Sequence, residues 1–369
     1  MSTRMFWLPA LLTAGLAALG LAMDSLALLR SWLAVSLVWG MIPLGALAVL
    51  MTHGLTGGRW GTASRPVWIA LAATLPLFVV SMLPLLLGLD ELFSWTRPES
   101  LLPEVVRKKL LYLNEPFFIG RTFFYLFVWL GLAWALSVWA VPRRVGKSGK
   151  GQAVHAPGLI LWVLTMTFFG FDWFMSLEPR FYSDVFGLML CMAAASAALA
   201  VGLLLMCIGK NSDVDVEARR DVANLWLAVL LGWAFMAFSQ YIIVWSGNLP
   251  DEILWYLHRR TSGWRVISAV SFALFFLLPF LILLSGSAKA NRRWLITASI
   301  ACLAGHGLQV LWLILPAFTH WQGTQYWLVP ALLVATGSTY AGYGYHRWVA
   351  AESHNHDVAR GSKTRGEHA

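Results

Sequence analysis

Long apolar runs, separated by short segments that hold most of the charge, constrain this chain more than any other feature of its sequence. A helix of about 20 apolar residues is long enough to cross a hydrocarbon core of roughly 30 Å. A segment in lipid must satisfy its own backbone hydrogen bonds, so only helices and closed barrels span membranes. The runs here are continuous and do not alternate apolar with polar residues. The sequence therefore predicts an all-α polytopic membrane protein.

Composition and charge exclude two other classes of protein. Hydrophobic residues make up 59% of the chain and charged residues 12%, whereas a soluble domain is about one quarter charged. The apolar runs therefore leave no room for a soluble catalytic domain. The net charge of +9 comes from basic residues in short loops, where they set the orientation of membrane helices and do not form a module that reads nucleic acid.

We expect about ten transmembrane helices, with ends defined to within a few residues. The apolar runs, in chain order, are 5–23, 32–51, 66–88, 117–141, 157–178, 185–208, 222–245, 264–286, 293–316 and 325–349. The first run also resembles a signal peptide, because Arg4 precedes it and Gly20-Leu21-Ala22 has the small residues of a cleavage site. Nothing downstream looks like a secreted domain that would need such a peptide.

The distribution of Lys and Arg predicts the orientation. Basic residues are more numerous in the loops on the side of both termini, and basic loops face the cytoplasm, so both termini are predicted to be cytoplasmic. Residues 1–350 are predicted to form a single transmembrane helical domain with two long outer-face loops, 89–116 and 246–263, each with the pattern of a short amphipathic helix. Residues 351–369 are predicted to be a disordered cytoplasmic tail.

No metal site or directly bound haem is expected. The three cysteines, Cys191, Cys207 and Cys302, all lie in apolar runs and form neither a disulfide framework nor a ligand pair. Small buried side chains are their expected role. A transmembrane haem needs two histidines at matching depth, and only His306 lies well inside a span.

Two carboxylates near the outer end of the fifth span are candidates for proton transfer. An ionisable residue inside a membrane span is costly and is a functional candidate for that reason. Asp172 lies inside this span and Glu178 follows at its edge. The alternative is a structural carboxylate, in which Asp172 pairs with Arg180 or Arg121.

His306 is a third candidate for proton transfer. Cys302, His306 and Gln309 are spaced to share one face of the ninth span. A neutral imidazole near the middle of the membrane can relay protons or hydrogen-bond a quinone carbonyl. The alternative is a histidine that a hydroxyl of a neighbouring helix satisfies.

A second polar group lies near the outer ends of the fourth and seventh spans. Gln240, Tyr241 and Asn248 are candidates for contact with a quinone, and so is Arg121. Side chains of this kind also hold helices together by hydrogen bonds. Arg121 is close enough to the interface to extend its charge into water.

Two segments carry a more specific signal than composition does. One is Phe171–Ser183, FDWFMSLEPRFYS, and the other is Phe238–Glu252, FSQYIIVWSGNLPDE. Together they resemble the signatures of the ActF family of membrane subunits of alternative complex III, a bacterial quinol:cytochrome c oxidoreductase. The wider family is NrfD/PsrC-like, and its length of about ten spans with a short tail matches nearly the whole chain.

The resemblance implies an architecture and a set of partners. The expected fold is two four-helix bundles with a flanking helix pair, in a bacterial inner (cytoplasmic) membrane. The expected partners are an ActC-like sister subunit, an iron–sulfur/molybdopterin-like subunit and multihaem cytochrome c subunits. Haem and iron–sulfur clusters would lie in those partners, and a quinone is the one ligand considered for this chain. The first segment carries Asp172 and Glu178, and the second carries Gln240, Tyr241 and Asn248.

The expected function is therefore that of a respiratory membrane subunit, which contributes a proton path or a quinone-proximal scaffold to quinol oxidation. The chain would be part of an oxidoreductase complex, not an enzyme alone. Two alternatives stay open, a purely structural membrane anchor and a stand-alone secondary transporter. A transporter favours broken helices at matched positions of inverted repeats, and the prolines in these spans form no clear matched pair.

Overall fold

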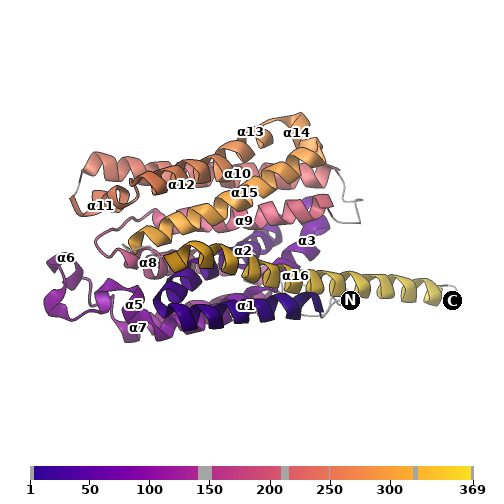
Figure 1. The fold of residues 1–369 in the computed structure, drawn as a ribbon. Helices are drawn as coiled ribbons and strands as arrows, with labels where there is room; N and C mark the ends of the chain where they lie inside the picture. Colours follow the sequence, from indigo (N-terminus) through magenta and orange to yellow (C-terminus); the bar gives the residue numbers. More distant parts are fainter. Residues whose placement is uncertain (1–3, 140–151, 209–215, 249, 319–322, 367–369) are drawn as a thin grey trace.

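The computed structural model describes residues 4–139, 152–208, 216–248, 250–318 and 323–366. In these ranges the chain forms helices and loops and no strand, which confirms the all-α prediction. Figure 1 shows the long helices side by side along one direction, with the N- and C-terminal labels toward the same end.

The long helices coincide with the apolar runs. In chain order they are α1 (Arg4–Met23), α2 (Ser25–Thr56), α3 (Arg59–Ala72) continued by α4 (Leu75–Met82), α7 (Glu115–Ala135), α8 (Gln152–Trp173), α9 (Phe186–Ile208), α10 (Val216–Gly247), α12 (Ser262–Phe272) continued by α13 (Leu278–Leu284), α15 (Arg292–Ile314) and α16 (Gly323–Gly366). The short helices are α5 (Leu89–Leu92), α6 (Glu104–Arg107), α11 (Pro250–His258) and α14 (Gly286–Ala290).

Eight helical stretches of the described residues are long and apolar enough to cross a membrane, so the chain is a multi-pass membrane protein. Both remaining expected spans are helical, but neither is among the eight. The described side chains of α1, Trp7–Met23, form a shorter apolar helix. Helix α16 has glycine, serine, threonine and tyrosine at 337–345, which lower its hydropathy. Helices α1 and α16 pack against each other and against α2.

Residues 351–366 of the predicted tail are described as the last part of α16, which continues to Gly366. No proline lies in 351–366, so none stops a helix that has already started. Figure 1 shows this part of α16 extending beyond the other helices. Residues 367–369 lie outside the described part.

Helix α2 occupies the centre of the fold. Of its most apolar window, 94% is buried inside the protein, and it packs against α3, α8, α9, α15 and α16. Asp24 caps its first turn by accepting a hydrogen bond from the Ala27 N–H at 2.9 Å. A Cβ atom on Gly45 would lie 1.9 Å from the Ala194 carbonyl oxygen of α9. Small residues that let helix backbones approach closely are typical of membrane interfaces.

A π-helical segment, Ala273–Leu277, joins α12 to α13. Pro279 follows it and lacks the N–H that a regular helix would donate to the carbonyl four residues earlier. The backbone hydrogen bonds of the helix therefore span five residues here instead of four. Helix α15 passes close to this segment. A Cβ on its Gly305 would lie 2.2 Å from the backbone nitrogen of Phe275, so this crossing requires glycine.

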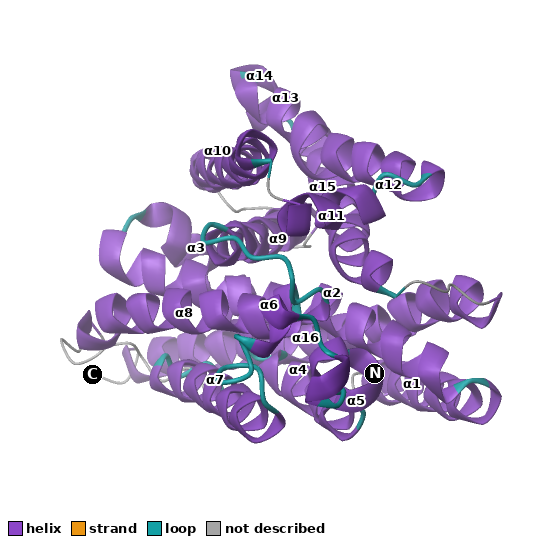
Figure 2. Ribbon diagram, turned by 90° about the vertical axis from the view of Figure 1, so that its left-hand side faces the viewer, coloured by secondary structure: helices purple, strands orange, loops and turns teal. Residues whose placement is uncertain are grey.

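The ends of the molecule differ in their connections. We call the end remote from the two termini the distal end, and it contains α5, α6 and α11 (Figure 1). Figure 2 views the molecule from this end. The helix expected in loop 246–263 is α11. Loop 89–116 holds two helices of four residues each, not one longer helix, because Pro98 and Pro103 interrupt it.

We expect Gly305→Ala to lower the thermal stability of the protein by several degrees in detergent, because overpacking a close crossing costs about 1–3 kcal/mol. Tryptophan fluorescence during heating measures this change. Gly307→Ala is the matched control on the same helix, since the nearest atom to its Cβ is Val38 Cγ1 at 4.0 Å. Equal melting temperatures for the two variants would contradict the tight crossing.

Candidate functional site

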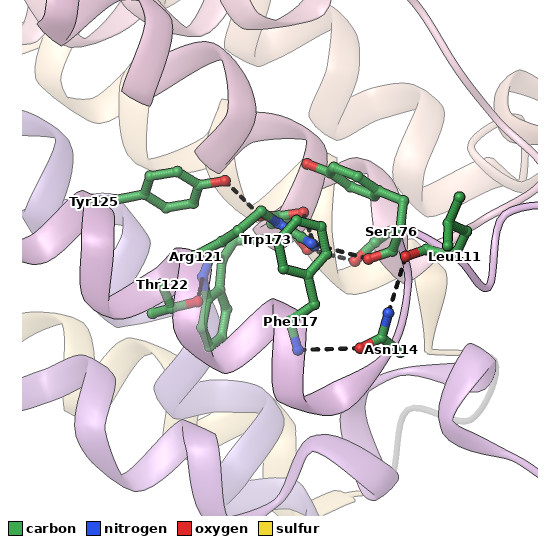
Figure 3. Close-up of polar contacts among 10 residues, drawn as sticks. Leu111, Asn114, Phe117, Arg121, Thr122, Tyr125, Trp173 and Ser176 are labelled. Carbon is green, nitrogen blue, oxygen red and sulfur yellow. Dashed lines mark hydrogen bonds and ion pairs between the residues drawn. The ribbon is translucent and has the colours of Figure 1, made fainter.

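Asp172 lies at the centre of a charged cluster at the distal ends of α7 and α8. Its side chain is fully buried. Arg121 of α7 binds it with both arms: Nε donates to Oδ2 at 2.8 Å and Nη2 donates to Oδ1 at 2.9 Å. The Tyr125 hydroxyl, one turn along α7, donates to Oδ2 at 2.8 Å. Figure 3 shows Arg121 and Tyr125 with Ser176, whose hydroxyl donates to the Asp172 carbonyl oxygen.

Aromatic rings enclose the Arg121 guanidinium. Its carbon lies 3.8 Å from the ring centre of Tyr112 and 4.3 Å from that of Phe117, both within the range of cation–π attraction. Its Nη1 donates to the Tyr112 carbonyl oxygen at 2.9 Å. Burial, together with the charge of Asp172, raises the pKa of the Tyr112 hydroxyl. Asn114 holds the start of α7 in place by accepting from the Phe117 N–H (Figure 3).

This geometry decides between the two partners expected for Asp172. Arg121 compensates its charge, and Arg180 is not in the bidentate pair. A buried carboxylate is tolerated when such a pair and further hydrogen bonds satisfy its oxygens. The Arg121 guanidinium makes its hydrogen bonds to Asp172 and to the Tyr112 carbonyl, so it does not face a ligand pocket.

Glu178 is at the centre of a second cluster, between the segment after α8 and the end of α11. Arg259 Nη1 lies 2.5 Å from Oε1, and His258 Nδ1 lies 2.8 Å from Oε2. The Arg259 side chain is 2% exposed and that of Glu178 14%. The two carboxylates considered for proton transfer, Asp172 and Glu178, are therefore bound to different basic residues.

Arg259 connects three parts of the chain. Its Nη1 also donates to the Trp255 carbonyl oxygen at 2.8 Å, and its Nη2 donates to the Leu313 carbonyl oxygen at 2.8 Å. The guanidinium stacks on the Trp255 ring at 3.7 Å. Burial lowers the pKa of Arg259, and the charge of Glu178 opposes that shift. Arg259 thus fastens the end of α15 to α11 and to the segment that carries Glu178.

Sequence reasoning did not single out Arg259 or Tyr112. The sequence feature that could have pointed to Arg259 is its position as a basic residue at the end of the short amphipathic helix in 246–263. Its burial was not visible there, because Glu178 and the Leu313 carbonyl that it binds belong to distant parts of the chain.

The polar face of α15 is buried as expected, but its members have different neighbours. His306 Nε2 lies 3.0 Å from the Val38 carbonyl oxygen of α2. Since a carbonyl only accepts, the imidazole donates there. Its Nδ1 is buried and has no partner among the described residues. Cys302 contacts Ser196 at 3.6 Å. The hydrogen bonds of the described part do not connect His306 with Asp172 or Glu178.

Gln240 and Tyr241 line a pocket of about 900 Å³ between α10, α11, α12 and α15. Gln240 is buried, and its Nε2 donates to the Tyr256 hydroxyl at 3.3 Å. Tyr241 is half exposed, and its ring meets that of Tyr256 edge-on at 5.6 Å. Gln309 of α15 lies on the same pocket. The structure thus brings these residues together at one pocket.

Asn248 and Arg121 do not belong to that pocket. Asn248 directly follows the last residue of α10 with φ of 46°, a left-handed conformation that asparagine tolerates and that commonly ends helices. Its N–H donates to the Val244 carbonyl oxygen at 3.1 Å. The four residues expected near a quinone therefore divide into two pocket residues, a helix end and an ion-pair partner.

No protein-family model matches this chain, and no curated protein matches it.

We expect Asp172→Asn to lower the melting temperature in detergent substantially, because breaking a buried ion pair from one side costs about 3–5 kcal/mol. Arg121→Gln should do the same, and the double variant should lose less than the sum of the two single variants. Tryptophan fluorescence measures all three.

The exposed pair between Glu104 and Lys108 provides the control. These side chains meet at 2.8 Å but are 71% and 74% exposed, and such pairs contribute little to stability. Glu104→Gln should leave the melting temperature unchanged. Additive losses at Asp172 and Arg121 would contradict the coupling between them.

Proposed function

We propose that this chain is an integral membrane subunit of a respiratory quinol:cytochrome c oxidoreductase of the alternative complex III type. Its partners would be an ActC-like sister, an iron–sulfur/molybdopterin-like subunit and multihaem cytochromes. In this proposal the chain spans the bacterial inner membrane with both termini in the cytoplasm. The termini lie toward the same end of the molecule (Figure 1), as an even number of spans requires.

One observation carries the proposal: at the distal end, the first of the two segments behind the resemblance packs against the end of the second and against the residues that follow it, in and just after α11. Glu178 of the first segment binds Arg259, seven residues after the second segment ends. Phe181 of the first stacks on Trp255 at 4.7 Å with an interplanar angle of 17°. A hydrogen bond and the charge of Glu252, in the second segment, raise the pKa of Tyr182 in the first. Segments that are distant in sequence thus build one surface.

This surface is suited to hold peripheral subunits. Lys109 of the loop between α4 and α7 donates to the Pro179 carbonyl oxygen at 2.7 Å, so that loop is fastened to the same surface. Ion pairs and stacked rings keep it rigid, and rigid interfaces lose little entropy on association. The chain's own contribution would be a scaffold on which the redox subunits dock.

The helix packing supports the expected two-bundle arrangement. Helices α2, α3, α7 and α8 form one connected group, and α9, α10, α13 and α15 form another. Helices α2, α3 and α8 of the first group pack against α9 of the second, and α1 with α16 lies beside them. Figure 2 shows α10 and α12–α15 apart from α4, α7 and α8.

A structural anchor is the second candidate function, and a specific observation favours it. Asp172 and Glu178, the carboxylates considered for proton transfer, both bind an arginine. His306 is the remaining candidate for a proton path, since its Nδ1 is free of hydrogen bonds in the described part of the chain. In the anchor role these pairs only stabilise the distal surface.

Purification of the tagged chain from native membranes in mild detergent tests the proposal. We expect multihaem cytochromes and an iron–sulfur protein to co-purify, seen by mass spectrometry and by a haem absorption band. A colourless chain without such partners would refute the redox-complex function and leave a transporter as the leading alternative.

Arg259→Gln should reduce the co-purified haem several-fold while the chain itself stays monodisperse in size-exclusion chromatography, because the distal surface loses its central contact. Lys289→Gln is the control, since Lys289 binds Asn224 at 2.7 Å at the opposite end. Unchanged haem with Arg259→Gln would show that partners dock elsewhere.

A further inference from the structure

The pocket of about 900 Å³ lies where the packing of the helices opens. Helix α10 packs against α13 and α14 at the end near the termini, and α12 packs instead against α15. The space between α10 and α12 therefore widens toward the distal end. Figure 2 shows these two helices apart at the end that faces the viewer.

The rim of this pocket is apolar and accessible from the side. Phe238 and Trp245 of α10 are 64% and 66% exposed, and Phe272 of α12 is 46% exposed. All three line the pocket. On a membrane helix such a rim faces the hydrocarbon, so a molecule can enter from the bilayer without crossing water.

The distal mouth of the pocket is positively charged. Arg259, Arg260 and Arg265 all line it. Glu178 neutralises Arg259, whereas Arg260 and Arg265 form no ion pair with any described residue. The first turn of α12 is also at this mouth, and its N-cap residue Thr261 makes no side-chain capping bond. Free N–H groups at a helix start attract anions.

Polar atoms without partners lie just below the arginines. Arg259 binds the carbonyl groups of Trp312 and Leu313, so Gln309 lies about one turn deeper on α15. The Trp312 Nε1 atom and the amide oxygens of Gln240 and Gln309 are buried and unpartnered within the described residues. Buried polar groups normally have a partner.

Because the pocket has basic side chains at its mouth, polar atoms below them and an apolar rim, we propose that it binds an anionic phospholipid. Its phosphate would lie on Arg260 and Arg265, one of its ester carbonyls would accept from the Trp312 Nε1–H, and one acyl chain would lie between α10 and α12. The inference does not depend on the proposed function, since an anchor or a transporter could hold such a lipid equally well.

Charge distinguishes this ligand from a quinone, the competing molecule for the same pocket. A quinone is neutral and needs hydrogen-bonding groups such as Gln240 and Tyr241, but it gives Arg260 and Arg265 no partner. A phosphodiester supplies the negative charge that both guanidinium groups lack. Complementary charge at the mouth therefore favours the phospholipid.

The test uses the full-length chain, purified in mild detergent with whatever subunits accompany it. Phosphatidylglycerol should raise its melting temperature, and phosphatidylcholine with the same acyl chains should not. In Arg260→Gln/Arg265→Gln the concentration of phosphatidylglycerol needed for half of the effect should rise roughly tenfold or more. Native mass spectrometry should show fewer retained anionic lipids in this variant.

Arg107→Gln/Lys108→Gln is the control, because it removes the same charge at the distal end but outside this pocket, and it should behave as the unaltered chain does. Equal stabilisation by phosphatidylcholine, or an equal loss in the control, would overturn the proposal. So would stabilisation by a short-chain quinone that is stronger than that by phosphatidylglycerol and unchanged in the arginine variant, which would identify the pocket as a quinone site.

Discussion

Glu178 and Arg259 meet at 2.5 Å in a place that excludes most water, and the distal end of the molecule depends on this contact. The guanidinium also binds the last turn of α15 and the end of α11. An unpaired charge there would be strongly destabilising. Removing either partner would therefore loosen α11, α15 and the segment after α8 together.

The second buried ion pair, between Asp172 and Arg121, fastens α7 to α8 in the same way. Asp172 accepts three hydrogen bonds from Arg121 and Tyr125, and Trp173 donates to Thr122 at 3.1 Å beside it. Two carboxylates that look available for proton transfer in the sequence are held by fixed partners in the fold. Between α10 and α12 no such pair is found among the described residues, and there the distal end holds the pocket of about 900 Å³.

The candidate site was predictable as a set of residues but not as an arrangement. The sequence identified Asp172, Glu178 and His306 as candidates because burying an ionisable side chain in a membrane span costs free energy whichever way the side chain points. The residues that bind them were harder to find. Arg121 is 51 positions from Asp172, and Arg259 is 81 positions from Glu178. Spacing within one helix carries no information about such partners, and for the same reason Asn248 was placed with Gln240 although it ends a helix.

The sequence by itself determined that the chain is all-α, that it is embedded in a membrane, and roughly where each long helix lies. Lipid imposes these features locally, since each spanning segment must satisfy its backbone within itself. Tertiary structure decided which carboxylate meets which arginine, that Gly305 must admit the backbone of Phe275, and that α10 and α12 separate to leave a pocket. Those outcomes depend on contacts between helices far apart in the chain, where shape and charge are matched only after the helices have packed.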